Sequence, residues 1–303
     1  MVEELTVLYN VPHELPLGIL VATYFYYTGL SAGSFVVSTL SYVFGYEKYK
    51  SVGKLAVVLA VVLLIMAPLH LIADLAQPQR FIHLMLMFNV RSMISWGSIM
   101  LTIYPINCVI YGYYMFKENK KMARIFGIIG IPLAIGVHGY CGFILALVVT
   151  RHLWNTALMP PLFLVSAVVS GIALMILVVI TKQRFFSQDK KVDMGAVLGM
   201  SKILAWTIVL DLFLVGVDIL ELTYVYSRGE GFDAAMLLIT GPLAMLFIVG
   251  EIILGGLVPF ALLTHPKTSG SLKAIAIASV LVLIGIYAMR INWVVGGQMI
   301  PLS

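Results

Sequence analysis

The sequence predicts an all-α integral membrane protein with eight spanning helices, and three observations lead to this prediction. First, 61% of the 303 residues are hydrophobic and only 11% are charged, whereas a soluble chain needs about 25% charged residues to cover its surface. Second, the mean hydropathy is +1.03. Third, the apolar residues form runs of the ~20 residues that an α-helix needs to cross the hydrocarbon core. A soluble globular fold is thereby excluded, and no basic face indicates a nucleic-acid partner.

Short polar or Pro- and Gly-containing breaks separate the apolar runs, for example at 47–50, 117–121 and 187–191. Runs longer than about 25 residues predict helices that tilt or extend beyond the bilayer. We expect a single polytopic domain over 1–303 made of two four-helix bundles, over about 16–150 and 156–293. The expected spans are 16–45, 54–76, 92–116, 124–150, 156–182, 196–227, 234–264 and 271–293.

The basic residues are distributed unevenly between the two sets of connections. Fourteen of the 19 Lys and Arg residues fall in or beside the connections that follow the first, third, fifth and seventh spans. Short loops rich in Lys and Arg stay on the cytoplasmic side. The sequence therefore predicts that both termini lie on the outer face. The acidic start, Met1-Val-Glu-Glu, lacks the basic region of a cleavable signal peptide.

One group of polar residues is predicted near the outer ends of the first helices. His70 and Asp74 are four residues apart and share one helix face. Such residues offer hydrogen-bond donors and exchangeable protons at the rim of an apolar bundle, as a quinone headgroup requires. The alternative is that they are ordinary polar and aromatic residues of the membrane interface. The group consists of Asn10, His13, His70, Asp74, His138 and Tyr140.

A second group lies in the last three spans. Asp211 and Asp218 are nearly two helical turns apart and face the same way, and Glu221 follows about one turn later. Glu251 and Arg290 occupy the next two spans. Ionisable groups inside a membrane cost several kcal/mol unless they are paired or hydrated. These five residues indicate either a row for proton transfer or a structural set of ion pairs.

Two intramembrane histidines, His70 and His138, could also ligate one haem b, but no second pair exists for a chain of haems. The two cysteines are too few for an iron–sulfur cluster, which takes four thiolates. No metal site is expected within the chain.

Several segments, in order along the chain, resemble the NrfD/PsrC family of membrane subunits of polysulfide-reductase-like complexes. The resemblance covers roughly residues 10–175 well and the remainder through the number of helices. The segments are 27–33 (YTGLSAG), 74–81 (DLAQPQRF), 92–97 (SMISWG), 140–143 (YCGF), 151–156 (RHLWNT), 160–163 (PPLF) and 166–167 (SA).

This resemblance implies a quinone site on the outer side, lined by Asn10, His13 and Tyr140, with menaquinone or a similar quinone as substrate and no haem or iron–sulfur cluster in this chain. It also implies an outer-side ferredoxin-like iron–sulfur subunit and a catalytic subunit, either a molybdopterin enzyme or a hydrogenase. The expected location is the cytoplasmic membrane of a prokaryote. The chain departs from the family at 76–78, where Gly-Arg-Pro is frequent, and at Cys141, where Thr is frequent.

The expected function is therefore that of a membrane anchor that binds quinone or quinol in a respiratory oxidoreductase. It would exchange electrons with the iron–sulfur subunit, be inactive alone, and in some form couple to proton movement. Two alternatives remain open. One is an ion- or proton-translocating subunit that uses the carboxylates of the last three spans, and the other is a cytochrome b-type haem anchor.

Overall fold

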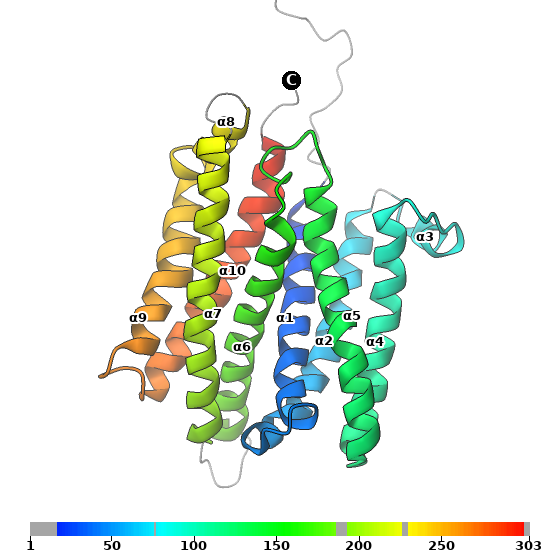
Figure 1. The fold of residues 1–303 in the computed structure, drawn as a ribbon, viewed down its shortest axis with the longest axis vertical. Coiled ribbons are helices and arrows are strands. Elements are labelled where there is room, and N and C mark those ends of the chain that lie inside the picture. Colours follow the sequence, from blue (N-terminus) through cyan, green and yellow to red (C-terminus); the bar gives the residue numbers. More distant parts are fainter. Residues whose placement is uncertain (1–16, 76, 186–192, 226–229, 300–303) are drawn as a thin grey trace, which may run out of the picture.

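The computed structural model describes residues 17–75, 77–185, 193–225 and 230–299, and these residues form helices and no strands. Eight helices are long and apolar enough to cross a membrane, which confirms the predicted number of spans. The helices stand side by side along the long axis of the molecule (Figure 1). We call the end at which α1 begins and α10 ends the upper end, and the opposite end the lower end.

Six of the eight spans are single α-helices and two contain π-helical turns. Short helices lie in the connections: η1 (Glu47–Tyr49), η2 (Pro78–Arg80), α3 (His83–Leu86) and α8 (Glu230–Ile239). The spans are α1 (Ile19–Tyr42), α2 (Lys50–Asp74), α4 (Met93–Phe116), α5 (Lys120–Ala146), α6 (Met159–Phe185), α7 (Met194–Leu220) continued by π-helical η3 (Glu221–Val225), π-helical η4 (Met245–Leu257) continued by α9 (Val258–Thr264), and α10 (Leu272–Met299).

The prediction of one continuous helix over 234–264 is wrong. The protein forms α8, turns, and begins the seventh span only at Met245. The amides of Thr240 and Gly241 both bond to the carbonyl of Met236, and Pro242 has no amide hydrogen to continue the helical ladder. The fourth span also ends earlier than expected, at Ala146 instead of residue 150.

The helices α1 and α6 lie in the middle of the molecule. The helix α1 packs against α2, α5, α6 and α10, and α6 packs against α1, α5, α7 and α10. The two central helices cross at Gly33 and Gly171, where a Cβ atom on Gly33 would lie 2.7 Å from the Cα atom of Gly171. Glycine is needed here because the two backbones approach so closely.

Hydrogen bonds join the two ends of the described residues at the upper end of the molecule. The side chain of Gln298 accepts from the amide of Leu17 and donates to its carbonyl, at 2.9 and 2.8 Å. The connection between α5 and α6 covers the end of α10, because Arg151 donates to the carbonyl of Gln298 and Trp154 donates to that of Trp293. The first and last helices are thus held together at the upper end of the molecule.

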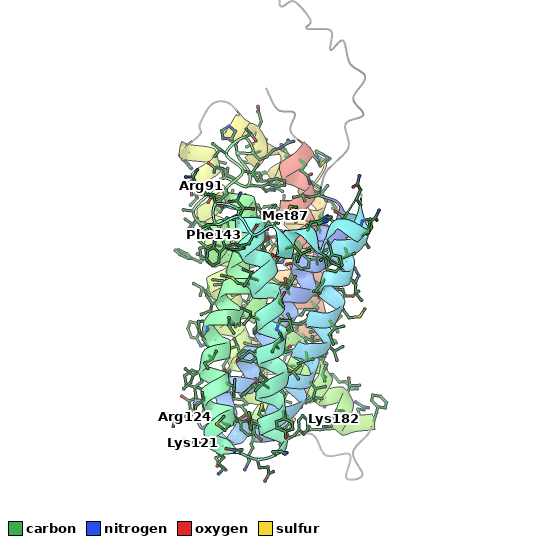
Figure 2. The ribbon with its side chains drawn as sticks, turned by 90° about the vertical axis from the view of Figure 1, so that its right-hand side faces the viewer. Met87, Arg91, Lys121, Arg124, Phe143 and Lys182 are labelled. Atoms are coloured by element: carbon green, nitrogen blue, oxygen red, sulfur yellow. The ribbon has the colours of Figure 1, made fainter. Side chains whose placement is uncertain are left out.

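Most of the described basic residues lie in the connections of the lower end or in the helix turns beside them. Figure 2 shows Lys121, Arg124 and Lys182 there, and Met87 and Arg91 toward the upper end. The helices α1, α4, α6 and α9 all end at this lower end. Which end faces the cytoplasm, and whether the helices form two separate bundles, stay predictions.

Candidate functional site

Two residues of the group predicted near the outer ends of the helices, His70 and Asp74, lie beside α1 or the residue before it. The carboxylate of Asp74, at the end of α2, lies beside the backbone amide of Gly18. The ring of His70 lies 5.0 Å from that of Tyr27, and its Nδ1 donates to the carbonyl of Met66 at 3.0 Å. Asn10 and His13 lie outside the described residues.

Tyr140 is 9% exposed and packs across α4 at Gly97, where any Cβ atom would overlap the tyrosine ring. Tyr24 of α1 lies close to Tyr140 and to Cys141, and the thiol of Cys141 donates to the carbonyl of Val137 at 3.4 Å. Tyr140 lies six residues before the end of α5, so at ~1.5 Å per residue it is ~9 Å below that end. No hydrogen bond joins Tyr140 to His70 or Asp74 among the described residues, but all three lie beside the upper part of α1, and we call them the upper-end cluster.

His138 was predicted with this cluster but contacts a different set of residues. It is fully buried, and its Nε2 lies 3.3 Å from Nη2 of Arg290 on α10. Its ring also lies against α1, where a Cβ atom on Gly29 would be 3.0 Å from its Cε1. His138 thus connects the helix of Tyr140 with the helix of Arg290.

Arg290 is fully buried and bonds mainly to α5 and α6. Its Nη2 donates to the hydroxyl of Ser166 at 2.6 Å and to the carbonyl of Phe163 at 3.4 Å. The guanidinium also lies over the ring of Phe163, 4.0 Å from its centroid, which is a cation–π contact. Asp211 and Glu251 lie within electrostatic range, yet no ion pair joins either of them to Arg290 among the described residues.

The carboxylates near Arg290 are buried and only partly hydrogen-bonded. Glu251 lies within the π-helical η4, and its Oε2 accepts from Nδ2 of Asn292 at 2.7 Å. The other oxygen of Glu251, Oδ1 of Asp211, Oδ1 of Asn292, Nε of Arg290 and Nδ1 of His138 have no partner among the described residues. Buried polar groups are normally satisfied, so this concentration of unpaired atoms makes these residues a candidate site. We call His138, Ser166, Asp211, Glu251, Arg290 and Asn292 the Arg290 cluster.

The Arg290 cluster lies at one depth, which the helix positions show. His138 is eight residues from the upper end of α5, and Arg290 is nine from that of α10, distances of ~12 and ~13 Å. Asp218 is closer to the upper end and accepts a hydrogen bond from Thr156 at 2.8 Å. Glu221 follows at the first residue of the π-helical η3. Asp211, Asp218 and Glu221 therefore follow one another along α7 and η3 from the Arg290 cluster toward the upper end, and we call these three residues the carboxylate ladder.

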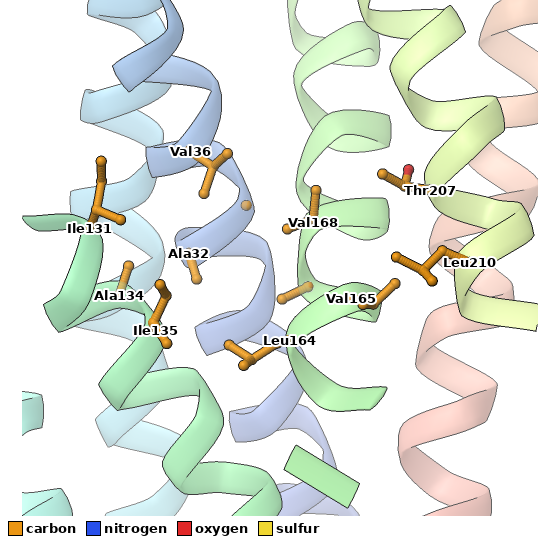
Figure 3. A pocket seen from close by; sticks show the side chains of 12 residues that line it. Ala32, Val36, Ile131, Ala134, Ile135, Leu164, Val165, Val168, Thr207 and Leu210 are labelled. Atoms are coloured by element: carbon orange, nitrogen blue, oxygen red, sulfur yellow. The ribbon is translucent and has the colours of Figure 1, made fainter. Parts of the chain in front are cut away.

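An apolar cleft of about 370 Å³ lies between α5, α6 and α7, with α1 behind it (Figure 3). Ala134 and Ile135 line it one turn before His138, and Leu210 lines it beside Asp211. No charged residue lines the cleft. The one hydroxyl in its lining, that of Thr207, donates to a carbonyl of its own helix, so the cleft suits an apolar tail.

The expected absence of a metal ion and of haem stays a prediction, and the surroundings of the candidate ligands are as follows. In the described residues no three His, Cys, Asp or Glu side chains come together as ligands. The Nε2 atom of His138 faces Arg290, and Nδ1 of His70 bonds to a backbone carbonyl. Ligation of iron by His138 through Nε2 would require Arg290 to move away.

Sequence reasoning did not select Ser166, Asn292, Thr156 or Tyr24. Asn292 carried a usable signal, since it lies two residues after Arg290 in an otherwise apolar helix. Ser166 and Thr156 fell within segments of the family resemblance but carried no residue-level signal. Their roles depend on contacts between helices, which spacing along one helix does not reveal.

Comparison with known proteins places the chain in a family. The family model of polysulphide reductase NrfD matches residues 8–302. The Hdr-like menaquinol oxidoreductase integral membrane subunit of Archaeoglobus fulgidus is 29% identical over 95% of this chain and 72% of its own length. The C subunit of selenate reductase from Mesobacillus selenatarsenatis is 28% identical over 94% of this chain and 74% of its own. The C chain of polysulfide reductase from Wolinella succinogenes is 28% identical over 92% of this chain and 93% of its own. The chain belongs to the polysulphide reductase NrfD family of membrane proteins.

Proposed function

We propose that this chain is the membrane anchor and quinone- or quinol-binding subunit of a respiratory oxidoreductase. The observation that carries the proposal is the upper-end cluster of His70, Asp74 and Tyr140 around α1 in a protein of this family. One relative is named as a menaquinol oxidoreductase subunit, which supports menaquinone or a similar quinone as substrate. The chain exchanges electrons with an iron–sulfur cluster of a partner and is inactive alone.

The proposed arrangement in the membrane has both termini on the outer face of a prokaryotic plasma membrane. The basic lower-end connections support this orientation (Figure 2). We further propose that residues 1–303 form one domain of two four-helix bundles. The helices α1, α2, α4 and α5 form the quinone-site bundle, and α6, α7, η4 with α9, and α10 form the second. Contacts of α1 with α2 and of α4 with α5 lie within the first proposed bundle, and α1 and α6 join the two bundles at the centre of the molecule.

The quinone headgroup binds, in this proposal, between the N-terminal segment and α5. Tyr140 donates its hydroxyl hydrogen to one carbonyl of the quinone, and His13 donates to the other, with Asn10 beside it. Asp74 and His70 exchange protons with the upper side of the site. We also propose His138 for this site; it lies two residues before Tyr140 on a different side of α5, where its Nε2 faces Arg290.

The proposed partners are a ferredoxin-like iron–sulfur subunit on the outer side and a catalytic subunit, a molybdopterin enzyme or a hydrogenase. Relatives named as parts of polysulfide and selenate reductases support a multi-subunit reductase. Leu86, Met87 and Val90 at the upper end are more than two-thirds exposed. These apolar side chains are available to a docked subunit or to lipid headgroups.

The test compares Tyr140→Phe and His13→Ala in the whole complex. Tyr140→Phe removes one hydroxyl and keeps the ring against Gly97, so the complex should assemble normally. Loss of a hydrogen bond worth ~1 kcal/mol predicts a several-fold loss of quinone affinity. Quinone-linked turnover should fall in both variants, whereas turnover with a soluble dye that bypasses this subunit should survive. Full quinone activity in both variants would refute the proposed site.

A second function, proton translocation, is favoured by the Arg290 cluster. Its buried carboxylates have unpaired oxygens and continue through Asp218 toward the upper end. In sealed vesicles, Glu251→Gln should reduce the proton movement that accompanies quinone turnover, as measured with a pH-sensitive dye. Unchanged proton movement per quinone would leave these residues a structural role.

A further inference from the structure

The contact between Arg290 and His138 fixes the protonation of the imidazole. A guanidinium has only donors, so Nε2 of His138 must accept the hydrogen bond across the 3.3 Å gap. The hydrogen of the neutral ring is then on Nδ1, which has no partner among the described residues. A proton added at Nε2 would place two donors and two positive charges against each other. Arg290 would then have to leave His138.

A second set of partners for Arg290 already lies within its electrostatic range. Asp211 and Glu251 each keep one unpaired oxygen, and Nε of Arg290 is unpaired as well, within the part of the protein that the structure describes. Tyr26 of α1 and Cys141 of α5 also lie within electrostatic range of the guanidinium. From α6 it meets the hydroxyl of Ser166, the backbone carbonyl of Phe163 and the ring of Phe163.

Counting charges shows that the cluster must hold one proton besides that of the neutral ring. With Arg290 charged and both carboxylates ionised, the buried net charge is −1. A buried unbalanced charge is costly in a medium of low dielectric constant. One proton restores neutrality, and it can be held in two ways. Either a carboxyl group of Asp211 or Glu251 holds it, or Nε2 of His138 holds it.

We propose that Arg290 is a two-position switch that passes one proton between the Asp211–Glu251 carboxyl pair and Nε2 of His138. In the first position, which the structure shows, Arg290 bonds to His138 and Ser166, and one carboxyl group is protonated. In the second position the O–H bond of that carboxyl group is broken, an N–H bond is formed at Nε2, and Arg290 pairs with two carboxylates. The net charge of the cluster is zero in both positions.

The switch rests on the proposed function, because the bound quinone is the group that finally supplies or takes up the proton. His138 and Tyr140 both lie on α5, two residues apart. A proton at Nε2 of His138 is therefore on the helix that carries the proposed quinone-binding tyrosine. The π-helical η4 carries Glu251, and π-helical turns frequently mark functional sites. The switch thus links quinone protonation to the carboxylate ladder of the second half.

The experiment measures infrared difference spectra of the complex, purified from native membranes through this chain, across a range of temperature at one pH. Asp211→Asn and Glu251→Gln identify the carboxyl C=O bands. The transfer keeps the number of protons in the cluster constant, so in the wild type the carboxyl and imidazolium bands should change in opposite directions and by equal amounts. His138→Gln keeps an oxygen that accepts from Arg290 but cannot take the proton. In this variant the change of the carboxyl band should be lost.

Two further variants keep the test decisive. His265→Gln, an exposed histidine of the lower end, is the matched control and should leave the carboxyl bands unchanged. Ser166→Ala removes the 2.6 Å hydrogen bond of the first position and should reduce the carboxyl signal even if His138→Gln does not assemble. Carboxyl bands that are identical in the wild type and in the assembled variants would overturn the switch. The spectra need no turnover, so coupled bands in a complex without quinone activity would refute only the proposed function.

Discussion

At the scale of single residues, the sequence identifies which groups matter better than it identifies their partners. The cost of burying ionisable groups in a membrane marked Asp211, Glu251 and Arg290, and the structure places all three in one buried cluster. The partner of His138 was not predictable, because Arg290 lies 152 positions later in the sequence. Residues on different helices meet according to helix rotation, which spacing along a single helix does not report.

Quinone occupancy should survive changes to the carboxylates. Glu251→Gln keeps an oxygen for the hydrogen bond from Asn292, and Asp218→Asn keeps one for Thr156, so both variants should fold. Their helices, η4 and α7, are remote in sequence from α2 and α5, which carry the upper-end cluster. The measurement is quinone extracted per complex, with Tyr140→Phe as the variant expected to lose it. Loss of quinone from a well-folded Glu251→Gln or Asp218→Asn complex would move the site to the second half.

Haem should be absent from the purified subunit. The nitrogen of His138 nearest to a neighbouring helix accepts from Arg290, and a charged guanidinium there opposes an iron cation. A reduced-minus-oxidised visible spectrum should show no α-band of the b type. An α-band that disappears in both His70→Ala and His138→Ala would restore the cytochrome alternative.

At the scale of helices, hydropathy predicted where spans occur but not how their backbones deviate. The predicted starts of 92 and 271 differ from the observed Met93 and Leu272 by one residue. Hydropathy missed the turn at Pro242, since the flanking segments are equally apolar. It gave no sign of the π-helical turns around Glu251, because these change the hydrogen-bond pattern and not the composition.

The crossing of α1 and α6 should be sensitive to a single methyl group. In Gly33→Ala the new Cβ atom meets the backbone of Ala167 and Gly171, and such overpacking costs about 1–3 kcal/mol. Gly216→Ala on α7 is the matched control, since nothing lies within 4 Å of its Cβ position. The thermal unfolding midpoint in detergent should fall for Gly33→Ala and stay or rise for Gly216→Ala. Equal midpoints would contradict the close crossing.

At the scale of the whole molecule, the number of spans follows from composition, but their packing order does not. On α2, Leu64 is buried while Val62 and Ile65 are half exposed or more. Lipid tails and protein cores are equally apolar, so the two kinds of face carry the same residue types. The central position of α1 and α6 could therefore be found only from the structure. Charged residues, unlike apolar ones, do carry information about the arrangement. Most of them lie near the helix ends, and their uneven distribution distinguishes the two faces of the membrane.

The orientation of the whole molecule can be tested at its C-terminus. Fourteen of 19 basic residues belong to the lower-end connections, and α10 ends at the upper end, so a tag after Ser303 should lie outside. In intact cells, a membrane-impermeant reagent should modify this tag. A second tag, inserted beside Asn119 between α4 and α5, should react only after the membrane is opened. Each tagged protein controls for the other, because both report on the same fold from opposite ends. The reverse pattern would place the lower end outside and move the proposed quinone site to the cytoplasmic face, beyond the reach of an iron–sulfur subunit on the outer side.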